Sequence, residues 1–253
     1  MRQFRSMVYP YVVWIAIMIV VPMLMILLYA FTKEGNDVTT FRFTLENFGR
    51  FFSDAVFLDV LKRSLIIAIF TTIICVLLGY PIAYAIATGP EKSKMFWILM
   101  ITLPTWINML VRTYAWVGIL QDDGLLNSFL GLFGIGPFKM MYTTFAVVLG
   151  MVYNFLPFMV LPIYNVLCKI DDNTINAARD LGANFTQTLL WVWFPLSLPG
   201  VISGITMVFV PALPTFVISN LLGGSKILLI GNVIEQEFTK GSNWNLGAGL
   251  SMV

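Results

Sequence analysis

The chain has 253 residues, of which 58% are hydrophobic and 11% are charged, whereas soluble domains carry about 25% charged residues. This composition excludes an ordinary soluble domain, and the net charge of +2 is too small to indicate a nucleic-acid partner. We therefore expect an all-α membrane protein whose apolar runs cross a lipid bilayer as helices.

The apolar runs predict about six transmembrane helices, because a helix needs about 20 residues to cross the hydrocarbon core. The five predicted spans are residues 8–31, 64–88, 95–120, 143–168 and one span within 181–225. The last of these contains Pro195, Pro199, Pro211 and Pro214, which predict a broken or strongly tilted helix. Residues 227–234 are too short to cross, and the run from Trp244 predicts a sixth span that is cut off at Val253.

Basic residues give a partial indication of orientation. Arg2 and Arg5 precede the first span and favour a cytoplasmic amino terminus. Basic residues elsewhere give conflicting indications of orientation, since Lys92 supports this assignment and Arg63 opposes it. Four predicted spans separate the amino terminus from the segment that starts at Ile170, so we expect both on the cytoplasmic side.

Residues 170–204, IDDNTINAARDLGANFTQTLLWVWFPLSLPGVISG, join a polar loop directly to a predicted span. The side-chain oxygens of residues 171–174 can cap a helix start, and good helix formers follow them. Gly182 can adopt the positive φ that ends one helix before a second begins near Asn184. The segment therefore predicts a short helix, a kink and a second helix.

The spacing of this segment resembles the signature of ABC importer permeases, which reads Glu-Ala-Ala, three residues, Gly, nine residues and Ile-x-Leu-Pro. Asn176 stands where the family has glutamate, Gly182 matches the glycine and Pro195 matches the proline. The alternative is an ordinary amphipathic loop helix. The resemblance implies a coupling segment, residues 170–195, that contacts an ATPase. Its candidate contact residues are Asn176, Ala177, Ala178, Arg179, Asp180, Leu181, Gly182 and Ala183.

Three further stretches resemble the first permease subunit of spermidine/putrescine importers: LPTWINMLVRTYAW at 103–116, YNFLPFMVLPIYNVL at 153–167 and LLGGSKILLIGNVIEQEF at 221–238. This resemblance covers essentially the whole chain and implies one permease domain, residues 1–253, with the type I ABC importer fold in the bacterial plasma membrane. It implies three kinds of protein partner, namely a second permease subunit, a cytosolic ATPase dimer and an external substrate-binding protein. The ATPase would hold ATP and Mg, and this chain would bind no cofactor or metal.

Other transport classes and enzymes fit the sequence less well. The chain has no His, and the predicted spans carry no Asp or Glu that could relay protons in a secondary carrier. Residues 223–226 lack the spacing of a phosphate-binding loop, and no catalytic set can be assembled. We predict a transport subunit that is not an enzyme. Importers for iron, sulfate or thiamine remain the alternative for cargo, and a carrier or channel acting alone is the alternative from another class.

Candidate substrate contacts follow from the chemistry of polyamines, which are flexible cations bound by carboxylates and aromatic faces. The candidates are Trp106, Tyr114, Trp116, Tyr153, Asp122, Asp123, Glu235 and Glu237. For the aromatic side chains, packing or an interface belt is the commoner role. Arg112 is the only charge in the run 95–120. We expect it to support structure or gating, through backbone carbonyls or the carboxylates of Asp122 or Asp123, because it would repel a cationic cargo.

Overall fold

The computed structural model describes residues 2–33, 43–240 and 243–252. The regular structure of these residues is helical, apart from one isolated bridge between Thr32 and Phe43, so the all-α prediction is confirmed. The chain divides into two compact units. The terminal unit combines residues 1–62 with 230–253, and the central unit comprises residues 63–229.

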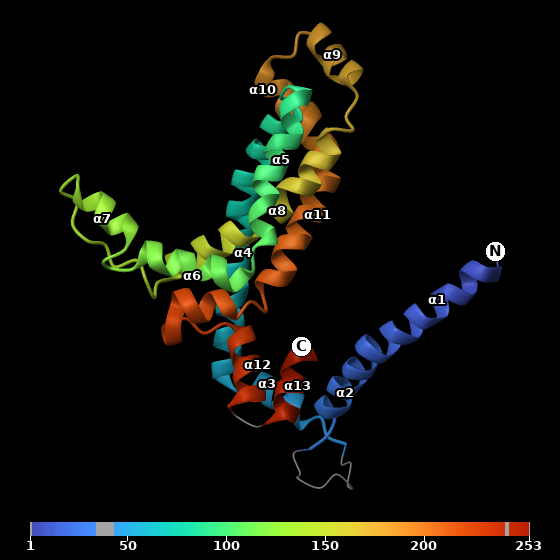
Figure 1. Ribbon diagram of the computed structural model, residues 1–253, viewed down its shortest axis with the longest axis vertical. Helices are drawn as coiled ribbons and strands as arrows, with labels where there is room; N and C mark the ends of the chain where they lie inside the picture. The colour runs from blue at the N-terminus through green and yellow to red at the C-terminus, as the bar shows by residue number, and fades with distance from the viewer. Residues whose placement is uncertain (1, 34–42, 241–242, 253) are drawn as a thin grey trace. The chain divides into compact units, whose positions relative to one another are not determined.

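The terminal unit contains α1 (Arg2–Ile15), α2 (Val21–Ala30), α3 (Glu46–Ser53), the start of α4 (Ala55–Ala87), α12 (Ile230–Thr239) and α13 (Trp244–Met252). A π-helical turn joins α1 to α2, so that residues Val8–Ala30 form one apolar helix of 23 residues. The first predicted span is therefore confirmed, and it is drawn in blue in Figure 1.

Two asparagine side chains donate to carbonyl groups at and just after the end of α2, where helical partners run out. The Asn47 amide of α3 donates to the carbonyls of Ala30 and Thr32, at 2.9 and 3.0 Å. The Asn245 amide of α13 donates to the carbonyls of Tyr29 and Thr32, at 3.1 and 2.9 Å. These bonds tie α2, α3 and α13 together.

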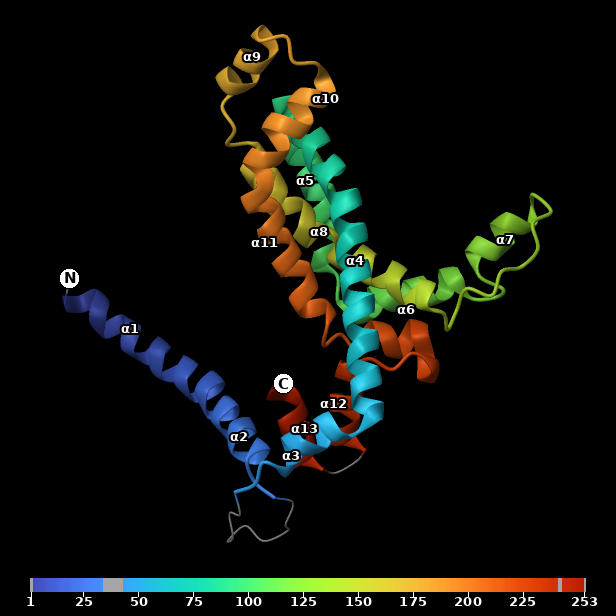
Figure 2. The same cartoon turned by 180° about the vertical axis from the view of Figure 1, so that it is seen from behind.

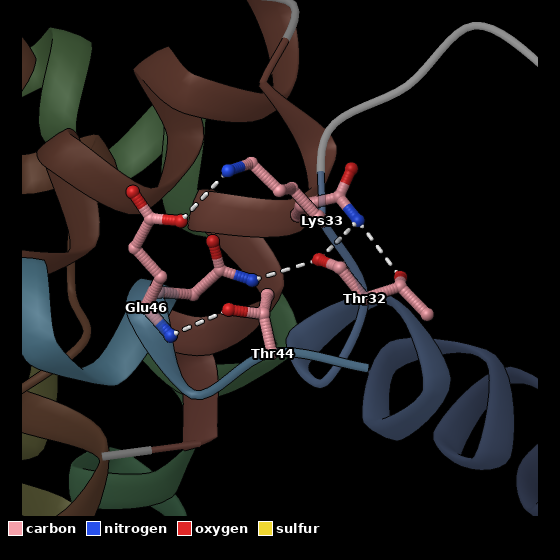
Figure 3. Close-up of polar contacts among 6 residues, drawn as sticks. Thr32, Lys33, Thr44 and Glu46 are labelled. Atoms are coloured by element: carbon pink, nitrogen blue, oxygen red, sulfur yellow. Dashed lines mark hydrogen bonds and ion pairs between the residues drawn. The ribbon is translucent and has the colours of Figure 1, made fainter. Parts of the chain in front are cut away.

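An ion pair and a small core accompany these bonds. Figure 3 shows Lys33 and Glu46, whose side chains approach to 3.3 Å, beside Thr44, whose hydroxyl accepts from the Glu46 N–H. The side chains of Phe51 and Leu246 are buried against each other and against Leu250. Polar bonds and apolar burial therefore both hold the terminal unit.

The central unit is a helix bundle (Figures 1 and 2). It holds the rest of α4, α5 (Glu91–Trp106), α6 (Met109–Leu120), α7 (Leu125–Gly131), α8 (Thr144–Leu167), α9 (Asp172–Asp180), α10 (Phe185–Thr188) and α11 (Phe194–Ala212). Helix α8 lies at its centre, and the side chains of Met151, Met159 and Ile163 are fully buried.

Glycines let α4 and α11 approach α8 closely, as small residues do between membrane helices. A Cβ at Gly79 of α4 would lie 2.8 Å from Cγ of Met159, and a Cβ at Gly200 of α11 would lie 2.8 Å from the Pro162 carbonyl oxygen. Both distances are shorter than side chains tolerate, so these helices touch α8 through their backbones.

Within the described ranges, four single helices are long and apolar enough to cross a membrane: Val8–Ala30, Ala55–Ala87, Thr144–Leu167 and Phe185–Ala212. They agree with the first, second, fourth and fifth predicted spans, although the second helix begins nine residues before the predicted residue 64. The irregularity predicted from the prolines is found late in the region 181–225: Phe185–Ala212 continues through a π-helical segment, η2 (Leu189–Trp193), but the helix is interrupted at residues 213–216 before it resumes at 217. Pro195 lies directly after η2 inside this continuous helix, so its missing N–H falls where the π-helical segment passes into α11.

The third predicted span, residues 95–120, falls on a bent pair of helices that is long and apolar enough to cross when the two are counted together. Helix α5 ends at Trp106 and the chain bends by 94° before it continues from Met109. The side-chain oxygen of Asn108 accepts from the Leu110 N–H at 2.8 Å and caps the new helix. High hydropathy on both sides of the bend conceals it in the sequence. The run from Trp244 forms α13, whose nine described residues are fewer than a span needs.

Candidate coupling site and translocation path

Helix α9 begins at a side-chain cap and is held by one apolar anchor. The Asp171 carboxylate accepts from the backbone N–H of Asn173 at 3.0 Å. Ile175 is only 4% exposed and packs into the core of the central unit, whereas Leu181, directly after the helix, is 90% exposed. The helix is therefore anchored on one side and presents its other sides outward (Figure 1).

Helix α9 ends in a left-handed turn at Gly182, whose φ is +85°. The Gly182 N–H donates to the Arg179 carbonyl at 2.8 Å, and the Ala183 N–H donates to the Ala178 carbonyl at 3.1 Å. This pair of bonds is a Schellman motif, in which glycine supplies the positive φ without steric cost. The predicted kink at Gly182 is confirmed.

Helix α10 begins immediately after the kink with a reciprocal cap. The Asn184 side chain accepts from the Gln187 N–H at 2.8 Å, and the Gln187 side chain accepts from the Asn184 N–H at 2.9 Å. This capping box satisfies two helix-end donors at once. Helix α10 then passes through η2 into α11, as the prediction of a second helix requires.

The candidate contact residues follow one another along the chain at the end of α9. Two of them, Ala178 and Ala183, are half-buried. The exposed ones are Asn176, Ala177, Arg179, Asp180, Leu181 and Gly182. The structure thus brings the predicted coupling residues together as a protruding, accessible feature.

The four aromatic substrate-path candidates have different surroundings. Trp116 of α6 and Tyr153 of α8 pack edge to face, with ring centroids 5.4 Å apart, whereas Trp106 is 76% exposed and Tyr114 is also exposed. The structure therefore assigns a packing contact to two of the four aromatic candidates.

The acidic candidates fall into two groups. Asp122 and Asp123 line an open hollow of about 380 Å³ beside α7. The buried Asn127 fixes this loop, because its amide donates to the carbonyls of Asp122 and Phe138, at 3.1 and 2.9 Å. Glu235 and Glu237 lie half-buried on α12, in the terminal unit.

Arg112 lies on α6, beyond the bend, rather than inside a straight span. Its buried Nε and Nη1 atoms have no hydrogen-bond partner among the described residues. The described part of the chain also contains no ion pair between Arg112 and Asp122 or Asp123, whose carboxylates are one of the two kinds of partner considered for it. The bend separates the two segments that the sequence places on one helix.

Two features escaped the sequence analysis. Asn154 of α8 is buried, and its Oδ1 atom has no partner in the described residues. Tyr84, near the end of α4, contacts Phe185 and Trp193 of the predicted coupling segment. The spacing of Tyr80 and Tyr84, four residues apart on one helix face, could have indicated the second feature.

Comparison with known proteins gives close sequence relatives. No protein-family model matches the chain. The chain is 38% identical over 242 residues to the spermidine/putrescine transport system permease protein PotB of Haemophilus influenzae, an alignment that covers 94% of this chain and 84% of the relative. PotB of Escherichia coli is 39% identical, with 94% and 88% covered. The inner membrane ABC transporter permease protein YdcU of Escherichia coli is 30% identical over 239 residues, with 89% and 75% covered.

A solved structure shows the same fold. A chain of a bacterial ABC transporter involved in the import of the acidic polysaccharide alginate superposes with a TM-score of 0.75 at 15% identity, covering 99% of this chain and 88% of that one. This likeness concerns the fold alone. The sequence relatives show that the chain belongs to the PotB family of ABC transporter permeases. The fold agrees with this family, and the chain is a multi-pass permease subunit of the bacterial plasma membrane rather than an enzyme.

Proposed function

We propose that this chain forms half of the translocation path of an ATP-driven importer for polyamines of the spermidine and putrescine class. A second permease subunit completes the path, and an external binding protein delivers the cargo. A cytosolic ATPase dimer holds ATP and Mg and drives the cycle. The names of the relatives support the cargo, and the alginate transporter, solved with a cargo-bound periplasmic protein, supports the binding protein.

The observation that carries the coupling proposal is the form of the segment around α9. Ile175 anchors the helix, and Leu181 is 90% exposed at its end. An apolar side chain that protrudes beside small residues fits a groove on another protein. Closure of the ATPase dimer would shift α9, and the capped turn at Gly182 would pass the shift through α10 to α11.

The proposed orientation places the amino terminus and α9 in the cytoplasm. Cysteines introduced at Asn173 and, separately, at Asp123 should then react with a membrane-impermeant reagent from opposite sides. Both variants are made in a background in which Cys75 and Cys168 are replaced by serine. Labelling of the two positions from the same side would refute this topology.

Purification and reconstitution test the function itself. The chain, expressed with a candidate second permease and a candidate ATPase from the same genome, should copurify with both. Spermidine with the binding protein should stimulate ATP hydrolysis by the reconstituted complex. Absence of the ATPase from the complex would refute the coupling proposal, and stimulation by iron, sulfate or thiamine in place of polyamines would refute the proposed cargo.

A further inference from the structure

Tyr84, near the end of α4, makes ring contacts with the beginning and the end of the helical segment that follows the kink, α10 and η2. Its ring centroid lies 6.2 Å from that of Phe185, at an interplanar angle of 73°. Trp193 lies 5.4 Å away at 90°. Both are edge-to-face arrangements, which aromatic pairs favour. One α4 side chain thus contacts α10 and the end of η2, and Figure 2 shows α10 close to α4.

A second tyrosine, one helical turn earlier on the same face, ties α4 to α11. The Tyr80 ring lies 5.6 Å from the Phe194 ring. The hydroxyls of Tyr80 and Ser197 are hydrogen-bonded at 3.0 Å, and Ser197 is fully buried. Because Gly79 presses the backbone of α4 against Met159 of α8, this contact is part of the closely packed bundle.

Pro81 separates the two tyrosine contacts. A proline inside a helix cannot donate to the carbonyl four residues earlier, here that of Leu77, and so weakens the helix locally. Tyr80 lies before this weak point and Tyr84 lies after it, on a helix end whose Ala83 and Ile86 are buried in the same core. A movement of α10 that reaches Tyr84 can then change the bend of α4 at Pro81.

Unfilled space lies beside Tyr84. A hollow of about 240 Å³ is lined by Tyr84, by Arg179 and Ala183 from the end of α9, and by Phe185, Thr188 and Trp193. Close-packed interiors resist displacement, so a hollow at this position leaves room for the end of α9 to shift toward α4. The contact with Tyr84 and the space beside it lie directly behind the proposed docking surface.

We infer that Tyr84 is a positioning residue for the transport cycle, which transmits the displacement of α9 to α4, while Tyr80 holds α4 to α11 on the other side of Pro81. This inference rests on the proposed function, because it requires that an ATPase moves α9. It adds a second route into the bundle, besides the covalent one through α10 and α11. If Tyr84 served only for packing, an aromatic ring would be needed at this position for stability. Its removal would then not change the amount of cargo transported per ATP hydrolysed.

Substitution of Tyr84 in the reconstituted full importer tests the inference. Tyr84→Ala should leave the ATPase bound and ATP hydrolysis within about twofold of the parent, while uptake per ATP hydrolysed falls about tenfold, as for a coupling free energy of ordinary size. Tyr84→Phe keeps both ring contacts and should retain parental coupling. Phe70→Ala removes an exposed ring from the same helix and controls for loss of apolar bulk.

Tyr80→Phe and Ser197→Ala each remove a single hydroxyl and should leave the fold intact. They therefore test the inference even if Tyr84→Ala fails to insert into the membrane. Each should lower uptake per ATP by about two- to fivefold, and the double variant should lose no more than either single variant, since both remove one bond. Additive losses would overturn the role given to this bond.

The outcomes separate this inference from the proposed function. If Gly182→Val disrupts coupling but Tyr84→Ala transports with parental yield per ATP, the inference is wrong and the proposed function stands. Loss of the ATPase from the Tyr84→Ala complex would also overturn the inference, because Tyr84 would then support docking rather than transmission. If Gly182→Val itself leaves coupling unchanged, the proposed function fails first.

Discussion

The α9 kink and the α5–α6 bend both redirect the chain within the central unit. They differ in whether the polar groups beside the turn find hydrogen-bond partners among the described residues. At the kink, the groups around Asp171, Gly182 and Asn184 satisfy one another through caps and a Schellman motif. At the bend, Asn108 caps α6, yet the buried donors of Arg112 on that helix have no partner among the described residues.

This difference teaches where the structure is encoded locally and where it depends on further contacts. Local caps act over three or four residues and need no distant partner. A buried guanidinium needs an acceptor from elsewhere, because leaving its donors unpaired is costly. We therefore expect the kink to keep its structure without contacts from other subunits. We expect Arg112 to gain hydrogen-bond partners in the assembled importer or in another state of the cycle.

The largest effect is expected at the kink itself. Gly182→Val should abolish spermidine uptake at normal membrane abundance, because a φ of +85° is strained for any side chain, by about 1–2 kcal/mol or more. Radiolabelled uptake and immunoblotting measure the two quantities. Gly118→Val is the matched control, since a Cβ there meets open space and the backbone is helical. Parental uptake by Gly182→Val would contradict the importance of the turn.

The next effect should appear at the bend, with the opposite sign. Arg112→Met removes two buried donors without partners and should stabilise the purified chain in detergent by about 1–3 kcal/mol. Its thermal unfolding midpoint should rise, whereas Arg112→Lys, which keeps the charge, should show little gain. A lower midpoint for Arg112→Met would mean that the guanidinium already has a partner in the isolated chain.

Removal of the α10 cap should have a smaller and local effect. Asn184→Ala breaks the capping box and should destabilise the start of α10 by about 1 kcal/mol. Amide hydrogen exchange should become faster over residues 184–193 and remain unchanged at α6. Thr186→Ala, on the same short helix, controls for the change in side-chain size. Uniform acceleration across the central unit would show that the kink is not a local structure.

The smallest effect is expected from carboxylates outside the two turns. Glu235→Gln combined with Glu237→Gln should lower spermidine uptake a few-fold at low salt, and the loss should fade as salt screens attraction of the cation. Asp122→Asn with Asp123→Asn removes the same charge from the hollow beside α7 and is the matched comparison. A loss that persists at high salt would indicate direct contact, and parental rates at every salt concentration would contradict a role in entry.

The sequence predicted those features that rest on local chemistry or on long apolar runs. The first and fourth spans are close to the observed helices, because each apolar run ends where polar chain begins. The helix, kink and helix around Gly182 followed from cap residues and one glycine. The resemblance to the family signature predicted a coupling role for the same residues, although Asn176 stands where the family has glutamate.

The sequence could not predict features that depend on tertiary contacts. Asn108 caps α6 within a run that remains apolar on both sides, so hydropathy extends across the bend. The prolines indicated an irregular helix but not where it is interrupted, since Pro195 and Pro199 lie within the continuous helix and the interruption comes at residues 213–216. The ring contacts of Tyr84 join α4 to residues more than 100 positions later, and no local pattern specifies such a pairing.

A cross-linking measurement at Leu181 tests the central claim most directly, because this side chain is 90% exposed at the end of α9. A photoreactive phenylalanine analogue in place of Leu181 should cross-link to the ATPase subunit in membranes that contain the whole importer. The same analogue at Phe70, exposed on α4, should not. An ATPase cross-link that forms at Leu181 and changes in yield with ATP is the predicted result. If Leu181 cross-links only to lipid or to the binding protein, α9 is not the coupling helix.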